Sequence, residues 1–328
     1  MPPREGMSSS RACPVCGDVR RQPTGLDPRS PYLRGRQYHV VRCARCGLLL
    51  TDPWPTAELL RQVYDSGDYY STVEASTTDS SNRPLIERAR GIIRSLVVRH
   101  HFALGGAGYR GRLASFVARR RFGWGPPGMS PGRLLDVGCG DGAFLLDARH
   151  AGWDVVGIET SRIAVENAAR IGLQVDSGSL EDHPFGPAEF DVVRLWSVLE
   201  HVPDVGLALH EITKLLRPGG WVILQVPNAD GFTARMTGSR WPGWDVPAHL
   251  VHFTRKTFER AVRTAGMLPM EIHSCSVGTM AGLHPLLKST PGRAAVFLMD
   301  QVFDLLGAGD TLMMFARKPL DAGLSGKS

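Results

Sequence analysis

A glycine-rich segment, Asp136–Gly142, is the part of this sequence whose residue types most directly suggest chemistry. It follows a strand-like run, Leu134–Val137, and precedes a helix-like run, Ala143–Ala148. Glycines at such a junction let the backbone approach a ligand closely, and open α/β sheets bind nucleotides at this place. Gly138 and Gly140 also fit the fingerprint of a dinucleotide site, so the loop alone leaves the cofactor open.

The carboxylate of Asp136 favours one kind of cofactor over another. A negative charge at the mouth of the loop repels a pyrophosphate but attracts the ammonium and sulfonium groups of S-adenosylmethionine (SAM). Glu159 lies about 20 residues further on, where an acid that binds ribose hydroxyls is expected. These two acids predict a cationic cofactor with a ribose.

Four cysteines near the N-terminus form two pairs with the spacing of metal ligands. Two residues separate Cys13 from Cys16, and two separate Cys43 from Cys46. Each pair can place two thiolates on one tetrahedral ion, and four protein ligands leave no open position for catalysis. Because disulfides are rare in the cytosol, the pattern predicts a structural Zn²⁺ ribbon rather than four free thiols.

From residue 133 onward, apolar runs alternate between strand-like and helix-like periods. This alternation predicts an α/β fold in which a parallel sheet carries helices on both faces. Strands are expected at 134–137, 155–158, 190–195, 221–226, 268–275 and 311–316, and helices near 143–148, 163–169, 207–216 and 255–264.

Composition divides the chain into three regions. Residues 1–52 are expected to form the zinc-ribbon module, and residues 53–130 a helical, arginine-rich linker or lid. Residues 131–328 are expected to form the α/β domain that binds the cofactor.

Overall composition and charge narrow the class of protein. The 328 residues are 43% apolar and 21% charged, as in a globular protein rather than a disordered or fibrous one. No apolar run of about 18 residues predicts a transmembrane helix, and no signal peptide is recognised, so a cytoplasmic location is expected. Basic residues concentrate in two segments: residues 1–50 carry nine Lys/Arg against three acids, and residues 83–121 carry ten arginines against one acid. Such charge either solubilises a surface or attracts an anionic partner.

Two further blocks accompany the glycine loop: Phe190–Val202, which contains Leu-Glu-His, and Leu215–Asn228, which contains Arg-Pro-Gly-Gly. With them the chain resembles class I SAM-dependent methyltransferases, in which these blocks are the fourth strand and the segment leading to the fifth. The resemblance implies a Rossmann-like seven-stranded methyltransferase sheet. With the ribbon, which ends in the phrase Val41–Pro53, it covers nearly the full chain and points to a bacterial group active in secondary-metabolite, sugar or glycan pathways.

The same resemblance implies which residues hold the cofactor. The glycine loop would surround the methionine part of SAM, Glu159 would bind the ribose hydroxyls, and Leu180 would flank the adenine. Many relatives carry Gly-Asp where this chain has Gly178 and Ser179, which leaves the acid that contacts the adenine amine open. Cys139 is expected to pack in the loop rather than to act as a nucleophile. The full predicted cofactor set is Asp136, Gly138, Cys139, Gly140, Glu159, Thr160, Ser179, Leu180, Trp196 and Ser197.

The methyl acceptor is expected at the carboxyl ends of the strands, near the loop that follows the fifth strand. Trp241, Trp244 and Asp245 in this loop are predicted to bind the substrate. Methyl transfer depends mainly on holding the acceptor in line with the methyl group, and a hydroxyl acceptor must also lose its proton. His249 or His252 could take that proton, since histidine titrates near neutral pH. Alternatively, one of them caps the following helix or packs in the loop.

His201, in the Leu-Glu-His phrase, is a third candidate base because it follows the fourth strand near the methyl group. A packing or hydrogen-bonding role is the alternative. The sequence therefore predicts an enzyme that transfers the methyl group of SAM to a small-molecule or glycan acceptor, most plausibly on oxygen. Methylation of a sugar carbon, an RNA methyltransferase that uses the basic ribbon, and a SAM-binding scaffold without activity are the alternatives. Nucleic acid is disfavoured, because the fifth-strand phrase Val-Pro-Asn228 is not of the base-flipping type.

Overall fold

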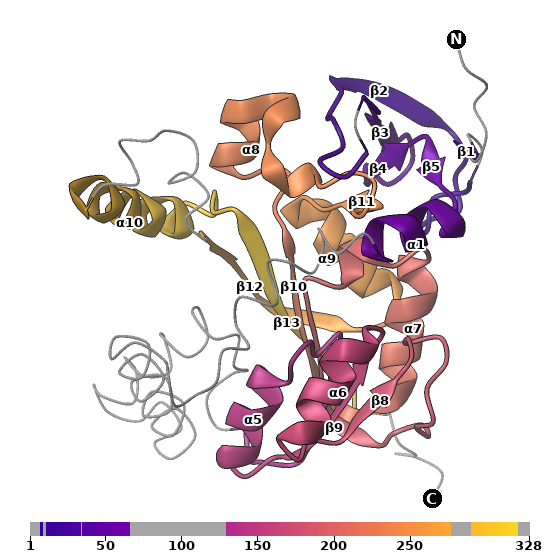
Figure 1. Ribbon diagram of the computed structural model, residues 1–328, viewed down its shortest axis with the longest axis vertical. Coiled ribbons are helices and arrows are strands. Elements are labelled where there is room, and N and C mark those ends of the chain that lie inside the picture. Colours follow the sequence, from indigo (N-terminus) through magenta and orange to yellow (C-terminus); the bar gives the residue numbers. More distant parts are fainter. Residues whose placement is uncertain (1–6, 9–10, 34, 66–128, 277–289, 321–328) are drawn as a thin grey trace, which may run out of the picture.

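The computed structural model describes residues 7–8, 11–33, 35–65, 129–276 and 290–320. Figure 1 shows a small N-terminal β-structure beside a larger part in which helices surround a long twisted sheet. Most of the arginine-rich segment predicted at 53–130 lies outside the described residues. The region boundaries at residues 52 and 130 therefore stay predictions.

The larger part is built on a mixed sheet of seven strands, in the order β12-β13-β10-β9-β6-β7-β8. Five neighbouring strands are parallel, whereas β13 runs antiparallel to both β10 and β12. This sheet confirms the predicted Rossmann-like seven-stranded architecture. Its strands are β6 (Arg133–Val137), β7 (Asp154–Glu159), β8 (Val175–Ser177), β9 (Phe190–Trp196), β10 (Leu216–Pro227), β12 (Leu268–Cys275) and β13 (Thr311–Arg317).

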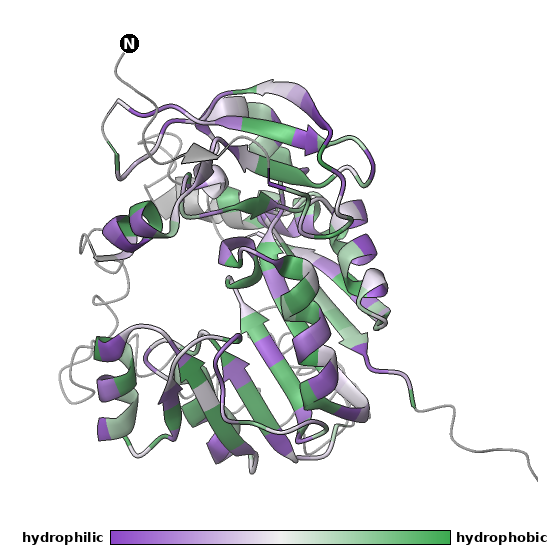
Figure 2. Ribbon diagram, turned by 90° about the vertical axis from the view of Figure 1, so that its right-hand side faces the viewer, coloured by the Kyte–Doolittle hydropathy of each residue, from purple (hydrophilic) through white to green (hydrophobic). Residues whose placement is uncertain are grey.

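Helices cover both faces of this sheet. Successive side chains of a strand point to opposite faces, and apolar side chains on both faces need cover. Leu134 belongs to a hydrophobic cluster with residues of α5 (Ala143–His150) and α6 (Arg162–Arg170). Its neighbour Leu135 belongs to a second cluster with residues of α7 (Val205–Leu215) and α9 (Arg255–Thr264). In Figure 2 the strands between these layers are largely hydrophobic.

The strand order reverses at β6, which lies between β7 and β9. Open α/β sheets bind their ligands beside the carboxyl ends of the strands at such a switch point. The carboxyl end of β6 carries the glycine loop predicted from sequence. The topology therefore puts this loop where a nucleotide-like ligand is expected.

The N-terminal part is a four-stranded sheet in the order β11-β4-β3-β2, and β11 comes from the loop after β10. Val251 of β11 pairs with Leu50 of β4, and Figure 1 shows the two strands side by side. The ribbon is therefore joined by backbone pairing to the loop that was predicted to meet the acceptor. The strands are β2 (Arg21–Leu26), β3 (His39–Cys43), β4 (Leu49–Asp52) and β11 (Val251–His252).

Shorter elements complete the described chain. The strands β1 (Met7–Ser8) and β5 (Trp54–Pro55) pair with each other, and 3-10 turns follow β9 and α8. Within the described ranges, no helix combines the length and hydropathy needed to cross a membrane. The remaining helices are α1 (Ala57–Asp65), α8 (Phe232–Thr237) and α10 (Thr290–Leu305), and the 3-10 turns are Leu199–His201, Gly238–Arg240 and Pro242–Trp244.

Candidate functional site

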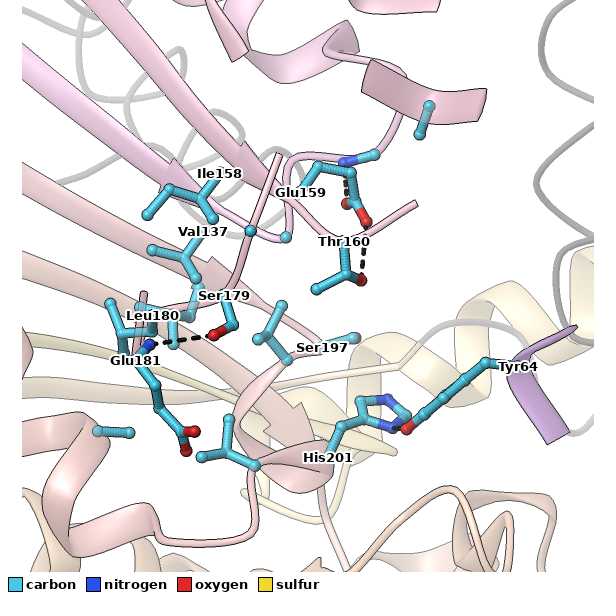
Figure 3. A pocket seen from close by; sticks show the side chains of 18 of the residues that line it. Tyr64, Val137, Ile158, Glu159, Thr160, Ser179, Leu180, Glu181, Ser197 and His201 are labelled. Carbon is cyan, nitrogen blue, oxygen red and sulfur yellow. Dashed lines mark hydrogen bonds between the residues drawn. The ribbon is translucent and has the colours of Figure 1, made fainter. Parts of the chain in front are cut away.

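A cavity of about 460 Å³ opens at the carboxyl ends of β6, β7 and β9. Figure 3 shows it between the ends of these strands, with His201 and Tyr64 together at one end, apart from Glu159. Seven of the ten residues predicted to hold the cofactor line this cavity: Gly138, Gly140, Glu159, Thr160, Ser179, Leu180 and Ser197.

Glu159 ends β7 with both carboxylate oxygens held in place. The backbone N–H of Gly140 donates to Oε2 at 2.9 Å, and the backbone N–H of Ser161 donates to Oε1 at 2.8 Å. The hydroxyl of Thr160 lies 3.3 Å from Oε1. The carboxylate is thus fixed beside the glycine loop, and it retains lone pairs that can accept hydrogen bonds from hydroxyl groups of a ligand.

Asp136, which was predicted to hold the cofactor, is buried in an ion pair at the end of β6. Its side chain is 1% exposed, and the Arg194 guanidinium donates to both of its oxygens at 2.8 and 3.1 Å. Arg194 therefore balances its charge, and Asp136 does not line the cavity, so its contribution to cofactor choice stays a prediction. The ion pair joins β6 to β9 at the start of the glycine loop.

Cys139 and Trp196 also lie outside the cavity lining. Cys139 is buried so close to Gly157 that a Cβ there would stand 2.6 Å from its sulfur, and burial raises the pKa of its thiol. Trp196 stacks under the Arg194 guanidinium at 4.6 Å. Cys139 belongs to a hydrophobic cluster against which Trp196 also packs.

The three candidate histidines differ in their access to the cavity. His201 lines it, whereas His249 and His252 do not. His252 is 3% exposed, bonds through Nε2 to the Thr51 hydroxyl at 3.0 Å, and packs against the ring of Trp244. Burial lowers the pKa of all three histidines, so they are neutral near pH 7. The structure leaves His252 without contact to a ligand in this cavity.

His201 and His249 lie edge to face, with ring centroids 4.7 Å apart. His201 Nδ1 lies 3.0 Å from the carbonyl oxygen of Ala248 and 3.3 Å from the Tyr64 hydroxyl. His249 Nδ1 lies 2.9 Å from the carbonyl oxygen of Gly243. The 3-10 turn after β9 and the loop after β10 are thus held together around these two rings.

Glu200 is the functional candidate that the sequence analysis missed. Its side chain is 1% exposed, and neither carboxylate oxygen has a hydrogen-bond partner in the described part of the chain. Burial raises its pKa to about 8. Oε1 lies 4.0 Å from His249 Nε2. Glu200 stands in the Leu-Glu-His phrase, so its presence was visible in the sequence. Only the fold brings it to the loop that carries His249.

Trp241 and Trp244 lie in a hydrophobic cluster with Tyr38 and Leu49 of the ribbon. They are 4% and 2% exposed and lie outside the cavity lining, and their predicted contact with the substrate stays a prediction. Asp245 accepts a hydrogen bond from the Tyr32 hydroxyl at 2.7 Å, and its Oδ2 lies 3.7 Å from His249 Nε2. This loop is therefore locked onto the ribbon.

The four ribbon cysteines converge as expected for ligands of one ion. Their sulfur atoms all lie within 4.8 Å of one another, and the sulfurs of Cys13 and Cys46, and of Cys16 and Cys43, are 3.5 Å apart. Four thiolates on a tetrahedral Zn²⁺ with bonds of about 2.3 Å are about 3.8 Å apart, so the geometry fits. All four are free thiols rather than disulfides.

Comparison with known proteins agrees with this architecture. Residues 107–268 match a family model described as "Methyltransferase domain". A ubiquinone biosynthesis O-methyltransferase of Klebsiella pneumoniae is 35% identical over 106 residues, which are 30% of this chain and 44% of that enzyme. The Ralstonia nicotianae protein of the same name is 28% identical over 171 residues, covering 48% of this chain and 72% of that enzyme.

Among solved structures, a SAM-dependent methyltransferase from Mesorhizobium loti is 18% identical. The match covers 57% of this chain and 91% of that chain, with a TM-score of 0.43. The chain matches less than half of the length of the Klebsiella relative.

Proposed function

We propose that this chain, whose residues 107–268 match a methyltransferase-domain model, transfers the methyl group of SAM to a hydroxyl of a small-molecule or glycan acceptor in the cytoplasm. One observation carries the proposal. A single cavity is lined at one end by the glycine loop and Glu159, and at the other end by His201. A donor and an acceptor bound in it would lie next to each other, which is the main requirement of a direct displacement.

The donor end of the cavity offers surfaces for both the methionine part and the adenosine part of SAM. Gly138 and Gly140 both have positive φ, at +68° and +55°, and an added Cβ on Gly140 would meet no protein atom within 4 Å. The open space beside Gly140 is part of the cavity, so a ligand can lie directly against the backbone there. Glu159 is positioned to accept hydrogen bonds from ribose hydroxyls, and Leu180 offers an apolar side for the adenine.

The acceptor end contains groups that suit a hydroxyl substrate. His201 and the Tyr64 hydroxyl line it, and Glu200 and His249 lie directly behind His201. We assign loss of the acceptor proton to this cluster rather than to His252. The curated relatives are named O-methyltransferases, which supports oxygen as the acceptor atom. Secondary metabolism is the proposed setting.

Substitution of Gly140 by alanine tests the donor site. An L residue at positive φ costs about 1–2 kcal/mol wherever it stands, so Gly140→Ala should still fold. The new methyl group would fill space that the cofactor needs. We expect SAM and S-adenosylhomocysteine to bind at least about 10-fold more weakly, a loss of about 1.4 kcal/mol or more measured by titration calorimetry.

Gly266→Ala is the matched control. Gly266 has a φ of +82°, also has no atom within 4 Å of an added Cβ, and lies outside the cavity lining. This variant should lose similar stability but keep its affinity for the cofactor. Equal affinity of the two variants would contradict the proposed position of SAM.

A further inference from the structure

We infer that Glu200, His201 and His249 bind a divalent metal ion of the Zn²⁺ class at the acceptor end of the cavity. One ligand atom from each residue lies within 4.8 Å of the others. Two imidazole nitrogens and one carboxylate form a donor set that first-row divalent ions accept, and it leaves positions open for a substrate. This site is distinct from the ribbon, whose ligands are four thiolates.

The first support is the state of Glu200. Its carboxylate is buried, and no donor of another described residue bonds to it. A buried carboxylate without a donor or a cation is strongly disfavoured, so native proteins pair such groups or use them to bind metals. The nearby Asp245 is itself an acid and provides no counter-charge. A bound cation supplies the missing positive charge.

The second support is the orientation of the two histidines. Nδ1 of His201 faces the Ala248 carbonyl, and Nδ1 of His249 faces the Gly243 carbonyl. A carbonyl oxygen can only accept, so each Nδ1 carries the proton and each Nε2 carries a lone pair. Histidines that bind metals are usually held in this way, with the other ring nitrogen donating to a carbonyl or a carboxylate.

The distances favour a shared ion over a direct proton relay. Glu200 Oε1 and His249 Nε2 are 4.0 Å apart, too far for a hydrogen bond. Two ligands of one ion with bonds of about 2.0–2.2 Å lie about 3–3.5 Å apart, so a small inward movement suffices. The Asp245 carboxylate, 3.7 Å from the same nitrogen and held by Tyr32, can stabilise the loaded site from outside.

The role of this ion rests on the proposed methyl transfer. Because His201 lines the cavity, an ion bound to it can also bind the acceptor oxygen and lower the pKa of its hydroxyl. The proton passes to water. The acceptor oxygen then forms the new O–C bond as the S–C bond breaks, and the electron pair of that bond remains on the sulfur of S-adenosylhomocysteine.

Metal stoichiometry of the full chain tests the site without SAM or an acceptor. After equilibrium dialysis against Zn²⁺, elemental analysis should find one ion fewer per chain in Glu200→Gln than in the native protein. Glu211→Gln makes the same chemical change on the outer side of α7, where Glu211 pairs with Lys214, and should keep the native ion content. Glu200→Gln should fold, because it removes a buried charge, and its melting curve checks this.

The outcomes separate the metal site from the proposed function. Equal ion content in Glu200→Gln and the native protein would overturn the site, whether or not the enzyme is active. Loss of methyl transfer in Glu200→Gln without any loss of bound ion would also overturn it and would indicate a proton relay. Loss of one ion, with S-adenosylhomocysteine binding retained, is the expected result.

Discussion

Replacing Arg194 by methionine should destabilise the protein by about 3–5 kcal/mol, because it leaves the carboxylate of Asp136 buried without a counter-charge. Both side chains are buried, at 9% and 1% exposure. The substitution also removes the stacking of the guanidinium on Phe144 and Trp196, at 3.8 and 4.6 Å. Unfolding in guanidinium chloride, followed by tryptophan fluorescence, measures the change in the free energy of unfolding.

Arg162→Met provides the control for this measurement. Arg162 pairs with Glu166 at 3.2 Å on the surface of α6 and is 90% exposed. Exposed pairs of this kind contribute about 0–1 kcal/mol, so the control should differ little from the native protein. A further variant, with both Asp136→Leu and Arg194→Met, should recover part of the lost stability. If Arg194→Met is no more damaging than Arg162→Met, the ion pair does not support the loop.

Replacing Cys43 by serine should weaken zinc binding by at least about 100-fold. Apparent zinc-binding free energies of about 10–16 kcal/mol are shared by four ligands, so each thiolate contributes about 3 kcal/mol. The effect should extend beyond the ribbon, since β4 pairs with β11 and the ribbon packs against Trp241 and Trp244. Methyl transfer should therefore fall more than cofactor binding, because the cluster that contains Trp241 and Trp244 includes no residue of the glycine loop.

Cys275→Ser is the matched control for the ribbon. Cys275 is also a buried free cysteine, but it packs in the cluster on the other face of the sheet. It should keep the native zinc content. Zinc is measured with a chromophoric chelator after competition. Native zinc affinity in Cys43→Ser would show that the four cysteines are not a zinc site.

The fold was predictable because it depends on local patterns. Strand-like and helix-like runs identified every strand of the sheet except the short β8, and the glycine loop identified the switch point at the end of β6. Seven of the predicted cofactor residues, and His201, line the cavity. These residues lie in or beside the loops that directly follow the strands, so their position is fixed by nearby sequence.

Interactions across long stretches of chain were not predictable. Arg194 meets Asp136 only because β9 and β6 are neighbours in the sheet, where these two residues are paired in register. The ion pair was therefore hidden, and the acid was interpreted as part of the cofactor site. In the same way, nothing near Trp241 and Trp244 reveals that the ribbon covers them.

The choice among the histidines also depended on tertiary structure. His249 and His252 have similar surroundings in sequence, but one faces Glu200 and the other faces Thr51. The sequence analysis assigned no role to Glu200, which belongs to the Leu-Glu-His phrase. Its importance appears only when the 3-10 turn after β9 meets the loop after β10, which leaves its carboxylate buried beside two imidazoles.

The central claim, that the cavity at the end of β6 binds SAM, is tested most directly by calorimetric titration of the purified full chain with S-adenosylhomocysteine. We expect saturable binding at one molecule per chain, weakened in Gly140→Ala and unchanged in Gly266→Ala, with no binding of NAD. Failure to bind either SAM or S-adenosylhomocysteine, or binding of NAD in their place, would contradict the account.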